Sequence, residues 1–437
     1  MGAEGMEVVA IAVFAATVAA IVLRLVDEAV AGLAGAVAAV VLLRGYTPGD
    51  AFRFIDWNVL AILFGMWVIT GYLVEAGFTS WVVGSIARRV RGYRGFLVAL
   101  SLAAGFTSVL VDNVLVILLF GSVAVEAARR AGGNPALAVM MVGLSANFMG
   151  TALLLGDLPP QLLHSIAGYE FLDFIWWRGR PGSFIVLTIS FLATLAVMYA
   201  AFIRGEPDAS LEGISASGGG EPEKPALALG LAFFAATVAG MALRPLLGVP
   251  LGFIAVAGAA GLALVAELAR RAGVAGLPGF EEVAERVEWR ALIFYASLFA
   301  LVGSLEASGV LEELARRAAP LLASPGARGF TAAYLTAAVP STIVEHDAML
   351  LSLLYVARDA ALAAGVQPDP LYWAMAWGAT LASNLTTAAA PALYVALLVA
   401  ERAGRRIGPG EFLRYSSVFV ASSLVVTYLV ALPFYAS

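Results

Sequence analysis

The chain has 437 residues, of which 61% are hydrophobic and only 13% are charged. A soluble domain has about 25% charged residues, so this composition indicates a polytopic protein embedded in the lipid bilayer. The absence of cysteine excludes disulfides and thiolate metal sites, two histidines are too few for a multi-histidine metal centre, and a net charge of -5 gives no indication of nucleic-acid binding.

Windows of about 20 apolar residues predict the membrane spans, because a helix of that length crosses the hydrocarbon layer. In the first half of the chain they fall at residues 8–23, 29–43, 59–74, 137–165 and 183–202. Residues 205–225 are rich in Gly, Ser, Pro and Glu, which predicts a flexible connector. In the second half the spans fall at residues 226–243, 251–268, 291–305, 371–399 and 415–435. The sequence thus predicts five spans on each side of one connector.

Two further apolar segments, residues 96–128 and 330–363, have polar centres and do not fit a simple span. Each divides into two arms of about 13 to 16 residues, which is short for a full crossing. The alternatives are two short spans or a hairpin that enters the membrane and returns, and we favour re-entrant hairpins. Amphipathic stretches with arginines, residues 80–94 and 311–320, precede the hairpins and are expected to lie in the membrane interface.

The span at residues 137–165 is interrupted by Gly150, Gly156 and two consecutive prolines, all of which weaken a helix. Backbone freed at membrane depth is tolerated only inside protein or beside a water-filled cavity. Asp157 lies at this break, and an ionisable group there is a functional candidate because its burial in hydrocarbon is costly. The plain alternative is a helix that ends in a proline-rich loop, but a second interrupted span at residues 371–399 favours a site.

The two halves share residues in the same order, which indicates an internal repeat. The matched positions are Asp56 with Glu288, Asp112 with Glu345, and Asn147 with Asn384. The predicted organisation is a first repeat at residues 1–204, a connector at 205–225, and a second repeat at 226–437. The predicted fold is therefore all-α, with two repeats of five spans that each contain a re-entrant hairpin and a broken helix.

An odd number of crossings per repeat places the second copy upside down in the membrane. The side reached after the first span carries 17 of the 26 lysines and arginines, and the opposite side carries nine. The positive-inside rule then places the connector in the cytoplasm and both termini outside, in a multi-pass protein of the plasma or inner membrane. The first hairpin would open from the cytoplasm and the second from outside.

Inverted repeats with paired discontinuous helices are typical of secondary transporters, whose site lies near the membrane midplane. The polar residues of the hairpins and broken helices are therefore the candidate ion-binding, substrate-binding and coupling residues, and no catalytic residue is expected. Their oxygen ligands suit sodium or a proton-exchanging site better than a soft metal, so the only expected cofactor is a coupling ion, H⁺ or Na⁺. The candidates are Ser108, Asp112, Asn113, Ser145, Asn147, Thr151, Asp157, Ser341, Thr342, Glu345, His346, Asp347, Ser383, Asn384, Thr386 and Thr387. Within this set, the candidate sodium ligands are Asp112, Asn113, Ser145 and Asn147.

Each candidate also has a structural interpretation. Serine, threonine and asparagine in membrane helices often only hydrogen-bond a neighbouring helix. Asp157 could cap the helix after the break, and His346 could be a proton relay or a hydrogen-bonded core residue that pairs with Asp347. No lysine or arginine falls at the centre of the four elements, so an anionic substrate is expected to be held by helix dipoles, hydroxyls and co-bound cations alone.

Three segments resemble a known family. SANFMGTALLLGDLPP at residues 145–160 resembles the motif SNIGGTATLIGDPPN, VDNV at 111–114 resembles LDNVT, and residues 400–415 resemble the last cytoplasmic loop and span. The family is the ion transporter superfamily, in the branch of arsenite efflux pumps, NhaD-type sodium–proton antiporters and the melanosomal P protein. The resemblance implies a homodimer in which the hairpins and broken helices form a transport domain that moves against a scaffold, as an elevator. Met149 in place of a usual glycine, and Glu345–His346 in place of a second Asp-Asn pair, depart from the family pattern.

The favoured function is a secondary active ion transporter, a proton- or sodium-coupled antiporter in which Asp112 and Glu345 alternate between protonated and ion-bound states. Among the coupled antiport activities, Na⁺/H⁺ exchange is favoured. Efflux of arsenite or a related inorganic oxyacid is the first alternative, because a neutral species would explain the absence of basic residues. Sodium-coupled transport of a carboxylate such as citrate is the third, and a channel or a membrane-embedded hydrolase is disfavoured.

Overall fold

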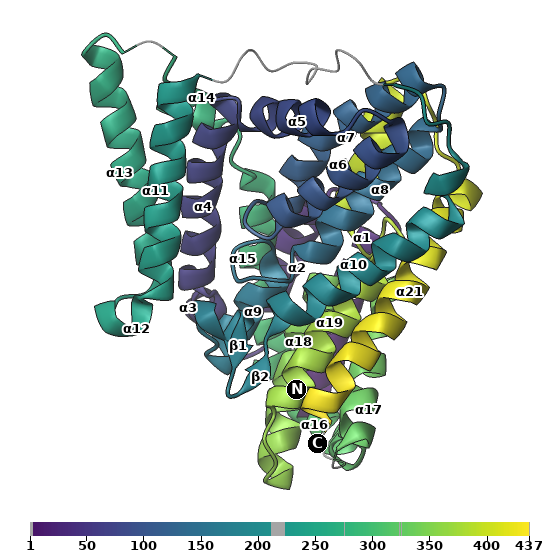
Figure 1. Cartoon of the computed structure of the whole chain (residues 1–437). Helices are drawn as coiled ribbons and strands as arrows, with labels where there is room; N and C mark the ends of the chain where they lie inside the picture. The colour runs from purple at the N-terminus through teal and green to yellow at the C-terminus, as the bar shows by residue number, and fades with distance from the viewer. Residues whose placement is uncertain (1–2, 211–222, 275, 323, 325, 437) are drawn as a thin grey trace.

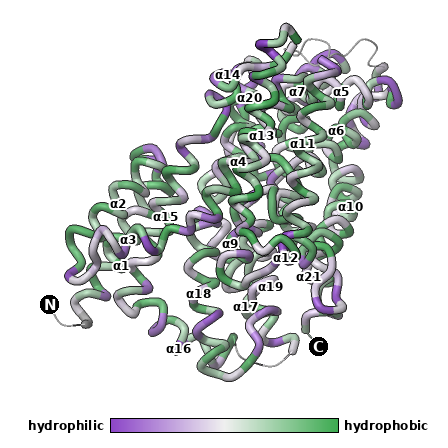
Figure 2. Tube along the Cα trace, turned by 90° about the vertical axis from the view of Figure 1, so that its left-hand side faces the viewer, coloured by the Kyte–Doolittle hydropathy of each residue, from purple (hydrophilic) through white to green (hydrophobic). Residues whose placement is uncertain are grey.

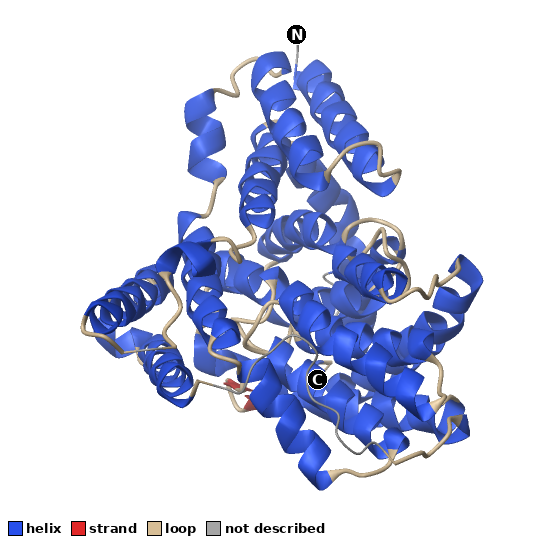
Figure 3. Ribbon diagram, turned by 90° about the horizontal axis from the view of Figure 1, so that it is seen from above, coloured by secondary structure: helices blue, strands red, loops and turns tan. Residues whose placement is uncertain are grey.

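The structure is a computed structural model of the whole chain and describes residues 3–210, 223–274, 276–322, 324 and 326–436 (Figure 1). The described residues form 21 α-helices, three short 3-10 helices and one pair of two-residue strands. Figure 3, viewed from above, shows that helices make up almost the whole molecule. The predicted all-α polytopic fold is confirmed.

The helices before the connector are α1 (Ala3–Val22), α2 (Glu28–Leu42), α3 (Pro48–Phe54), α4 (Trp57–Glu75), α5 (Phe78–Arg89), α6 (Tyr93–Ser108), α7 (Asn113–Ala131), α8 (Pro135–Met149), α9 (Leu158–Ala167) and α10 (Ser183–Ala201). Between α9 and α10 lie the strands β1 (Trp176–Trp177) and β2 (Arg180–Pro181), which pair antiparallel. The helices after the connector are α11 (Lys224–Ala242), α12 (Arg244–Leu247), α13 (Leu251–Arg271), α14 (Phe280–Ala284), α15 (Trp289–Ala307), α16 (Val310–Leu322), α17 (Ala327–Ala338), α18 (His346–Ala364), α19 (Asp369–Ser383), α20 (Pro391–Arg402) and α21 (Pro409–Tyr435).

Seven of the described helices are long and apolar enough to cross a membrane: α1, α4, α10, α11, α13, α15 and α21. Each coincides with a predicted span. Helix α2, which is apolar but shorter, covers the predicted span at residues 29–43. The two predicted broken helices appear as the pairs α8–α9 and α19–α20.

Both halves place the same kinds of helix in the same order. A short helix (α3, α14) precedes a span (α4, α15), an amphipathic helix (α5, α16), two hairpin helices (α6–α7, α17–α18), an interrupted pair (α8–α9, α19–α20) and a last span (α10, α21). Contacts cross between the halves in a matching way: α4 packs on α13 and α15 on α2, while α20 packs on α7 and α8, and α9 on α18 and α19. This order agrees with an internal repeat, and the inversion of one copy stays a prediction.

The two hairpins lie toward opposite ends of the molecule. In Figure 1, α6 and α7 lie in the half of the view that carries α5, whereas α17 and α18 lie in the half that carries both termini. Helix α5 runs across this view, roughly perpendicular to α4 and α11, which is the orientation expected of an interfacial helix.

Apolar side chains on the outer helices face away from the protein. Hydrophobic residues cover most of the length of the outer helices α11 and α13 in Figure 2. On α2, Val30, Leu33, Val37 and Val41 are each more than half exposed and recur every three or four residues. A continuous apolar stripe of this kind is unfavourable in water but is satisfied by lipid.

The connector is only partly the free segment that its composition predicts. Residues 211–222 lie outside the described part, but Glu206 to Ser210 contact the first hairpin. The backbone N–H of Arg94 donates to Asp208 Oδ1 at 3.2 Å, and that of Asn134 donates to Glu206 Oε2 at 2.7 Å. These charged acceptors fix the start of α6 and the turn before α8, so the prediction of a flexible connector is wrong for residues 206–210.

The hairpin interpretation predicts that both ends of the α6–α7 pair lie on one side of the membrane. The chain has no cysteine, so single cysteines at Arg94 and Arg130 can be labelled without background. Both positions should react with an impermeant maleimide from the same side, because Arg94 Nε donates to the carbonyl of Glu206 at 2.6 Å and α7 ends beside the same segment. Labelling from opposite sides would contradict both the hairpin and the inverted repeat.

Candidate functional site

The tip of the first hairpin is closed by a capping aspartate. Helix α6 ends at Ser108, and Asp112 is the N-cap residue of α7, where its Oδ1 accepts hydrogen bonds from the N–H groups of Val114 at 2.9 Å and Leu115 at 3.2 Å. Capping satisfies N–H groups that have no partner inside the helix. It therefore explains how a carboxylate is held at the polar tip of an apolar hairpin.

The break in the first broken helix packs directly against this tip. A Cβ on Gly156 would lie 2.4 Å from the carbonyl oxygens of both Ser108 and Gly150, so only glycine allows the two backbones to approach this closely. Asp157 Oδ1 then accepts from the N–H of Leu158 at 2.9 Å, at the start of α9. Asp157 thus does cap a helix, as the structural interpretation held, with its second oxygen directed elsewhere.

Two asparagines join the hairpin to both broken helices. Asn113 Nδ2 donates to Asp157 Oδ2 at 2.8 Å and to Asn147 Oδ1 at 3.0 Å. Asn147 Nδ2 donates in turn to Ser383 Oγ of α19 at 3.3 Å. This buried network links hairpin one to the first and the second broken helix.

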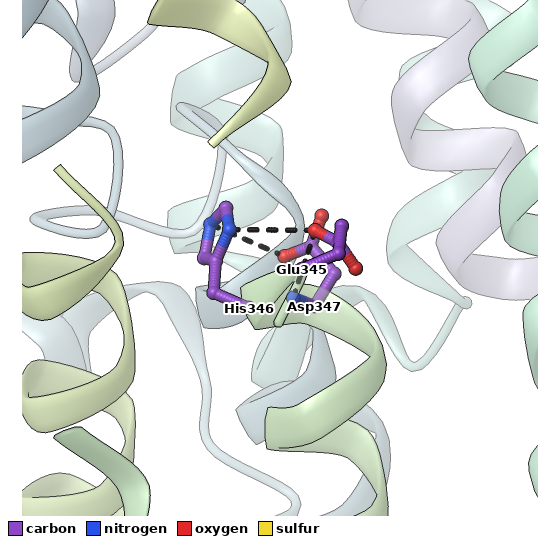
Figure 4. Close-up of side chains that lie close together, drawn as sticks. All are labelled: Glu345, His346 and Asp347. Atoms are coloured by element: carbon purple, nitrogen blue, oxygen red, sulfur yellow. Dashed lines mark hydrogen bonds and ion pairs between the residues drawn. The ribbon is translucent and has the colours of Figure 1, made fainter. Parts of the chain in front are cut away.

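The second hairpin presents three adjacent ionisable residues. Glu345 caps α18 through the N–H groups of Asp347 at 3.0 Å and Ala348 at 2.9 Å, as Asp112 caps α7. His346 Nδ1 lies 3.4 Å from a Glu345 oxygen, and its Nε2 lies 3.5 Å from Asp347 Oδ1 (Figure 4). All three residues are almost completely buried.

A cavity of about 660 Å³ connects these elements. Eight of the predicted residues line it: Asp112, Asn113, Asn147, Asp157, Glu345, His346, Asp347 and Thr387. Three of the four candidate sodium ligands belong to this group, and Ser145 does not. Both hairpins and both broken helices therefore contribute polar groups to one space, which is what a shared binding site requires.

The other predicted residues lie outside the cavity lining. Ser108, Ser145, Thr151 and Ser341 are buried with hydroxyl groups that have no partner among the described residues. Thr386 donates to the carbonyl of Thr342 at 2.7 Å and thereby ties the second break to the second hairpin. Ser383 donates to the carbonyl of Thr380 at 2.7 Å. Of the bonds in this group, that of Thr386 joins two elements, and none of these residues lines the cavity.

Asn147 and Asn384 do not occupy equivalent places, so their sequence match is wrong as a structural pairing. Asn147 lies inside α8, two residues before its end, whereas Asn384 is the C-cap residue that follows α19. Asn384 Nδ2 lies 3.3 Å from the carbonyl of Thr380 in its own helix, and within the described part of the chain its side chain makes no bond to the first half. The two breaks therefore differ in their chemistry.

Sequence reasoning missed the cavity wall that the remaining helices supply. Beside the predicted residues, the lining includes Arg24, Asp27, Glu28, Glu288, Arg290, Tyr295 and Tyr394. Arg24 Nη2 donates to the carbonyl of Thr387 at 3.1 Å and its guanidinium lies 4.2 Å from the centre of the Tyr394 ring, while Arg290 forms an ion pair with Asp27. The expectation that an anion would meet no basic residue is therefore wrong.

One of these missed residues had a signal in the sequence. Glu288 matches Asp56 in the repeat, but the two side chains are used differently. Asp56 caps α4 by accepting from the N–H groups of Asn58 at 2.9 Å and Val59 at 3.0 Å, whereas Glu288 makes no capping bond and lines the cavity. The repeat match thus indicated that Glu288 lies at a helix start, but not that its side chain lines the cavity.

Comparison with known proteins places this architecture in a family. The model of the citrate transporter family matches residues 18–378, which is more than half of the chain. The chain belongs to the citrate transporter family. The identification agrees with the ion transporter superfamily indicated by the sequence motifs.

Relatives and solved structures agree with this membership. An uncharacterized transporter of Mycobacterium tuberculosis is 32% identical over 96% of this chain and 97% of its own length. The human P protein is 24% identical over 98% of this chain and 60% of its own length. The YdaH transporter of Alcanivorax borkumensis matches 89% of this chain and 88% of its own with a TM-score of 0.57 at 18% identity, a likeness in fold. Members of the citrate transporter family are secondary transporters of the membrane and not enzymes, as predicted for this chain.

Proposed function

We propose that this member of the citrate transporter family is a proton- or sodium-coupled ion antiporter that works by alternating access, with Na⁺/H⁺ exchange as the leading activity. The observation that supports it is that three carboxylates from three separate elements line one cavity. Asp112 comes from the first hairpin, Asp157 from the first broken helix and Glu345 from the second hairpin. A carboxylate that is either protonated or bound to a cation, but not both, couples the flows of the two ions.

The charge of the cavity favours a cation. Its lining carries seven carboxylates, on Asp27, Glu28, Asp112, Asp157, Glu288, Glu345 and Asp347, and two arginines, Arg24 and Arg290. A cleft lined mainly by one sign of charge concentrates ions of the opposite sign. Asn113 and Asn147 line the same cavity, and amide oxygens are hard ligands of the kind that suits sodium.

The elements that carry the proposed ligands are the ones expected to move. In our proposal the α6–α7 and α17–α18 hairpins and the two broken helices move together as a transport domain, and the cavity wall with Arg24, Glu28 and Glu288 belongs to the scaffold. The contacts of Arg24 with Thr387 and Tyr394 would then break and re-form in each transport cycle. We further infer a cytoplasmic connector and external termini, which the asymmetry of basic residues supports. The homodimer is inferred from the family resemblance alone.

Transport of a carboxylate such as citrate is the second candidate. Arg24 and Arg290 in the cavity wall favour it, because arginine binds carboxylates in two-pronged geometry, and the matching family model is described as a citrate transporter. Arsenite efflux loses its main reason, which was the expected absence of basic residues around the substrate.

Flux measurements in proteoliposomes separate the candidates. Sodium, arsenite and citrate would each be offered under an imposed pH gradient with the pure protein. We expect sodium to drive saturable proton movement in the absence of the other two. If only citrate moves protons, the carboxylate transporter is correct, and flux that follows the membrane potential without exchange would identify a channel.

The arginines give a second, independent test. Arg24→Gln and Arg290→Gln should each reduce citrate transport at least tenfold if citrate is the substrate, since a charge-assisted hydrogen bond contributes roughly 1.5–3 kcal/mol. Sodium–proton exchange should then change less than threefold. Arg88→Gln is the matched control, because Arg88 lies on α5 and bonds Ser85 outside the cavity. Equal losses of sodium and citrate transport would show that the arginines only hold the structure.

A further inference from the structure

The second hairpin holds a histidine whose orientation is fixed and whose free nitrogen has no partner. His346 Nδ1 lies 2.9 Å from the carbonyl oxygen of Ala389. A carbonyl oxygen only accepts hydrogen bonds, so Nδ1 carries the proton and donates it. In the neutral ring Nε2 then presents a lone pair, and this atom has no hydrogen-bond partner among the described residues although it is buried.

A second lone-pair atom faces this nitrogen. Asp347 Oδ1 is also buried without a hydrogen-bond partner in the described chain, and it lies 3.5 Å from His346 Nε2. Buried polar atoms are normally satisfied, so two unsatisfied acceptors that face each other require a proton or a cation between them. His346 and Asp347 are each 4% exposed, which leaves bulk water little access to either atom.

The spacing fits a bound metal ion. Two ligand atoms held about 2.0 to 2.1 Å from one ion at the tetrahedral angle are about 3.4 Å apart. Glu345 adds a carboxylate, and one donor atom from each of Glu345, His346 and Asp347 lies within 4.8 Å of the others (Figure 4). The bond from Nδ1 to a backbone carbonyl is the usual support that orients a metal-ligating histidine.

We propose that Glu345, His346 and Asp347 bind one divalent transition-metal ion of the Mn²⁺ or Zn²⁺ class at the tip of the second hairpin. One imidazole and two carboxylates suit these ions better than sodium, which is bound by oxygen ligands. All three residues line the cavity, which provides an entry path and room for water in the remaining coordination positions. The proposal does not depend on the transported substrate, because binding is measured without transport.

The test measures binding of Mn²⁺ to the purified, detergent-solubilised chain, prepared with an affinity tag that lacks histidine. Loss of the electron paramagnetic resonance signal of free Mn²⁺ reports the bound fraction, and competition with Zn²⁺ gives its relative affinity. We expect one ion per chain. His346→Asn and Asp347→Asn should each weaken binding at least tenfold.

The chain offers a matched control in its only other histidine. His164 has both ring nitrogens engaged, with Nε2 3.2 Å from Asn58 Nδ2 and Nδ1 2.7 Å from the carbonyl of Tyr169. His164→Asn should therefore leave Mn²⁺ affinity unchanged. Melting curves recorded without metal verify that each variant is folded before it is titrated.

Two results would overturn the proposal. If the wild-type chain binds neither Mn²⁺ nor Zn²⁺ at millimolar concentration, the three residues do not form a metal site. If both His346→Asn and Asp347→Asn bind Mn²⁺ as tightly as the wild type, the ion lies elsewhere on the cavity wall. Both results come from binding measured without transport, so a failure of the metal site is distinguishable from a failure of sodium–proton exchange, which is measured separately in proteoliposomes.

Discussion

Asp112→Asn is expected to abolish coupled ion exchange while the protein remains folded. Asp112 caps α7 through one oxygen, Oδ1, which accepts both N–H groups. Asparagine is as good a cap as aspartate and retains that oxygen, so the helix keeps its start. The substitution removes the charge and the proton that the proposed exchange needs. Proton-driven sodium flux should fall at least a hundredfold, or its pH dependence should disappear, in proteoliposomes assayed across a range of pH.

The control separates coupling from capping. Asp112→Ala removes the cap as well and should cost about 1 kcal/mol of stability beyond the loss of transport. The repeat match suggests Glu345→Gln as an equivalent test, but that variant also weakens the cap of α18. Glu345 accepts one N–H group with each carboxylate oxygen, whereas glutamine has only one side-chain oxygen. Normal transport with an unchanged pH profile in Asp112→Asn would place coupling elsewhere, with Asp157 the next residue to test.

Gly156→Ala should separate the first hairpin from the first broken helix and eliminate transport. The added methyl group would lie 2.4 Å from two backbone carbonyl oxygens, of Ser108 and Gly150, and neither can rotate away as a side chain can. Overpacking in a well-packed core costs typically 1–3 kcal/mol, and a clash with backbone lies at the upper end of this range. The melting temperature and the yield of folded protein should both fall.

Gly410→Ala is the matched substitution. Gly410 lies in the first turn of α21, and a Cβ there would meet nothing within 4 Å. Alanine is favoured over glycine in helices, so this variant should be as stable as the wild type or slightly more stable. If Gly156→Ala transports normally and melts at the wild-type temperature, the hairpin and the break do not pack as the structure shows.

The sequence by itself determined the class of fold and the position of its irregular elements. An apolar composition, spans of about 20 residues and glycines and prolines inside apolar segments are local properties, because each reports what a short stretch of backbone can do in a lipid environment. For this reason the interruption at Gly150 to Asp157 and the polar tip at Asp112 could be predicted from adjacent residues. The family motifs added the superfamily, since they lie on these same stretches.

Only the tertiary structure decided which of these residues share a space and what surrounds them. Arg24 and Glu288 lie far from the motifs in sequence, and they reach the cavity because helices of one half pack against those of the other. The same packing gives Asn147 a partner in Ser383 and turns Asn384 back onto its own helix. Side chains such as these have no local pattern that reveals their role, because their environment is created by contacts between segments hundreds of residues apart.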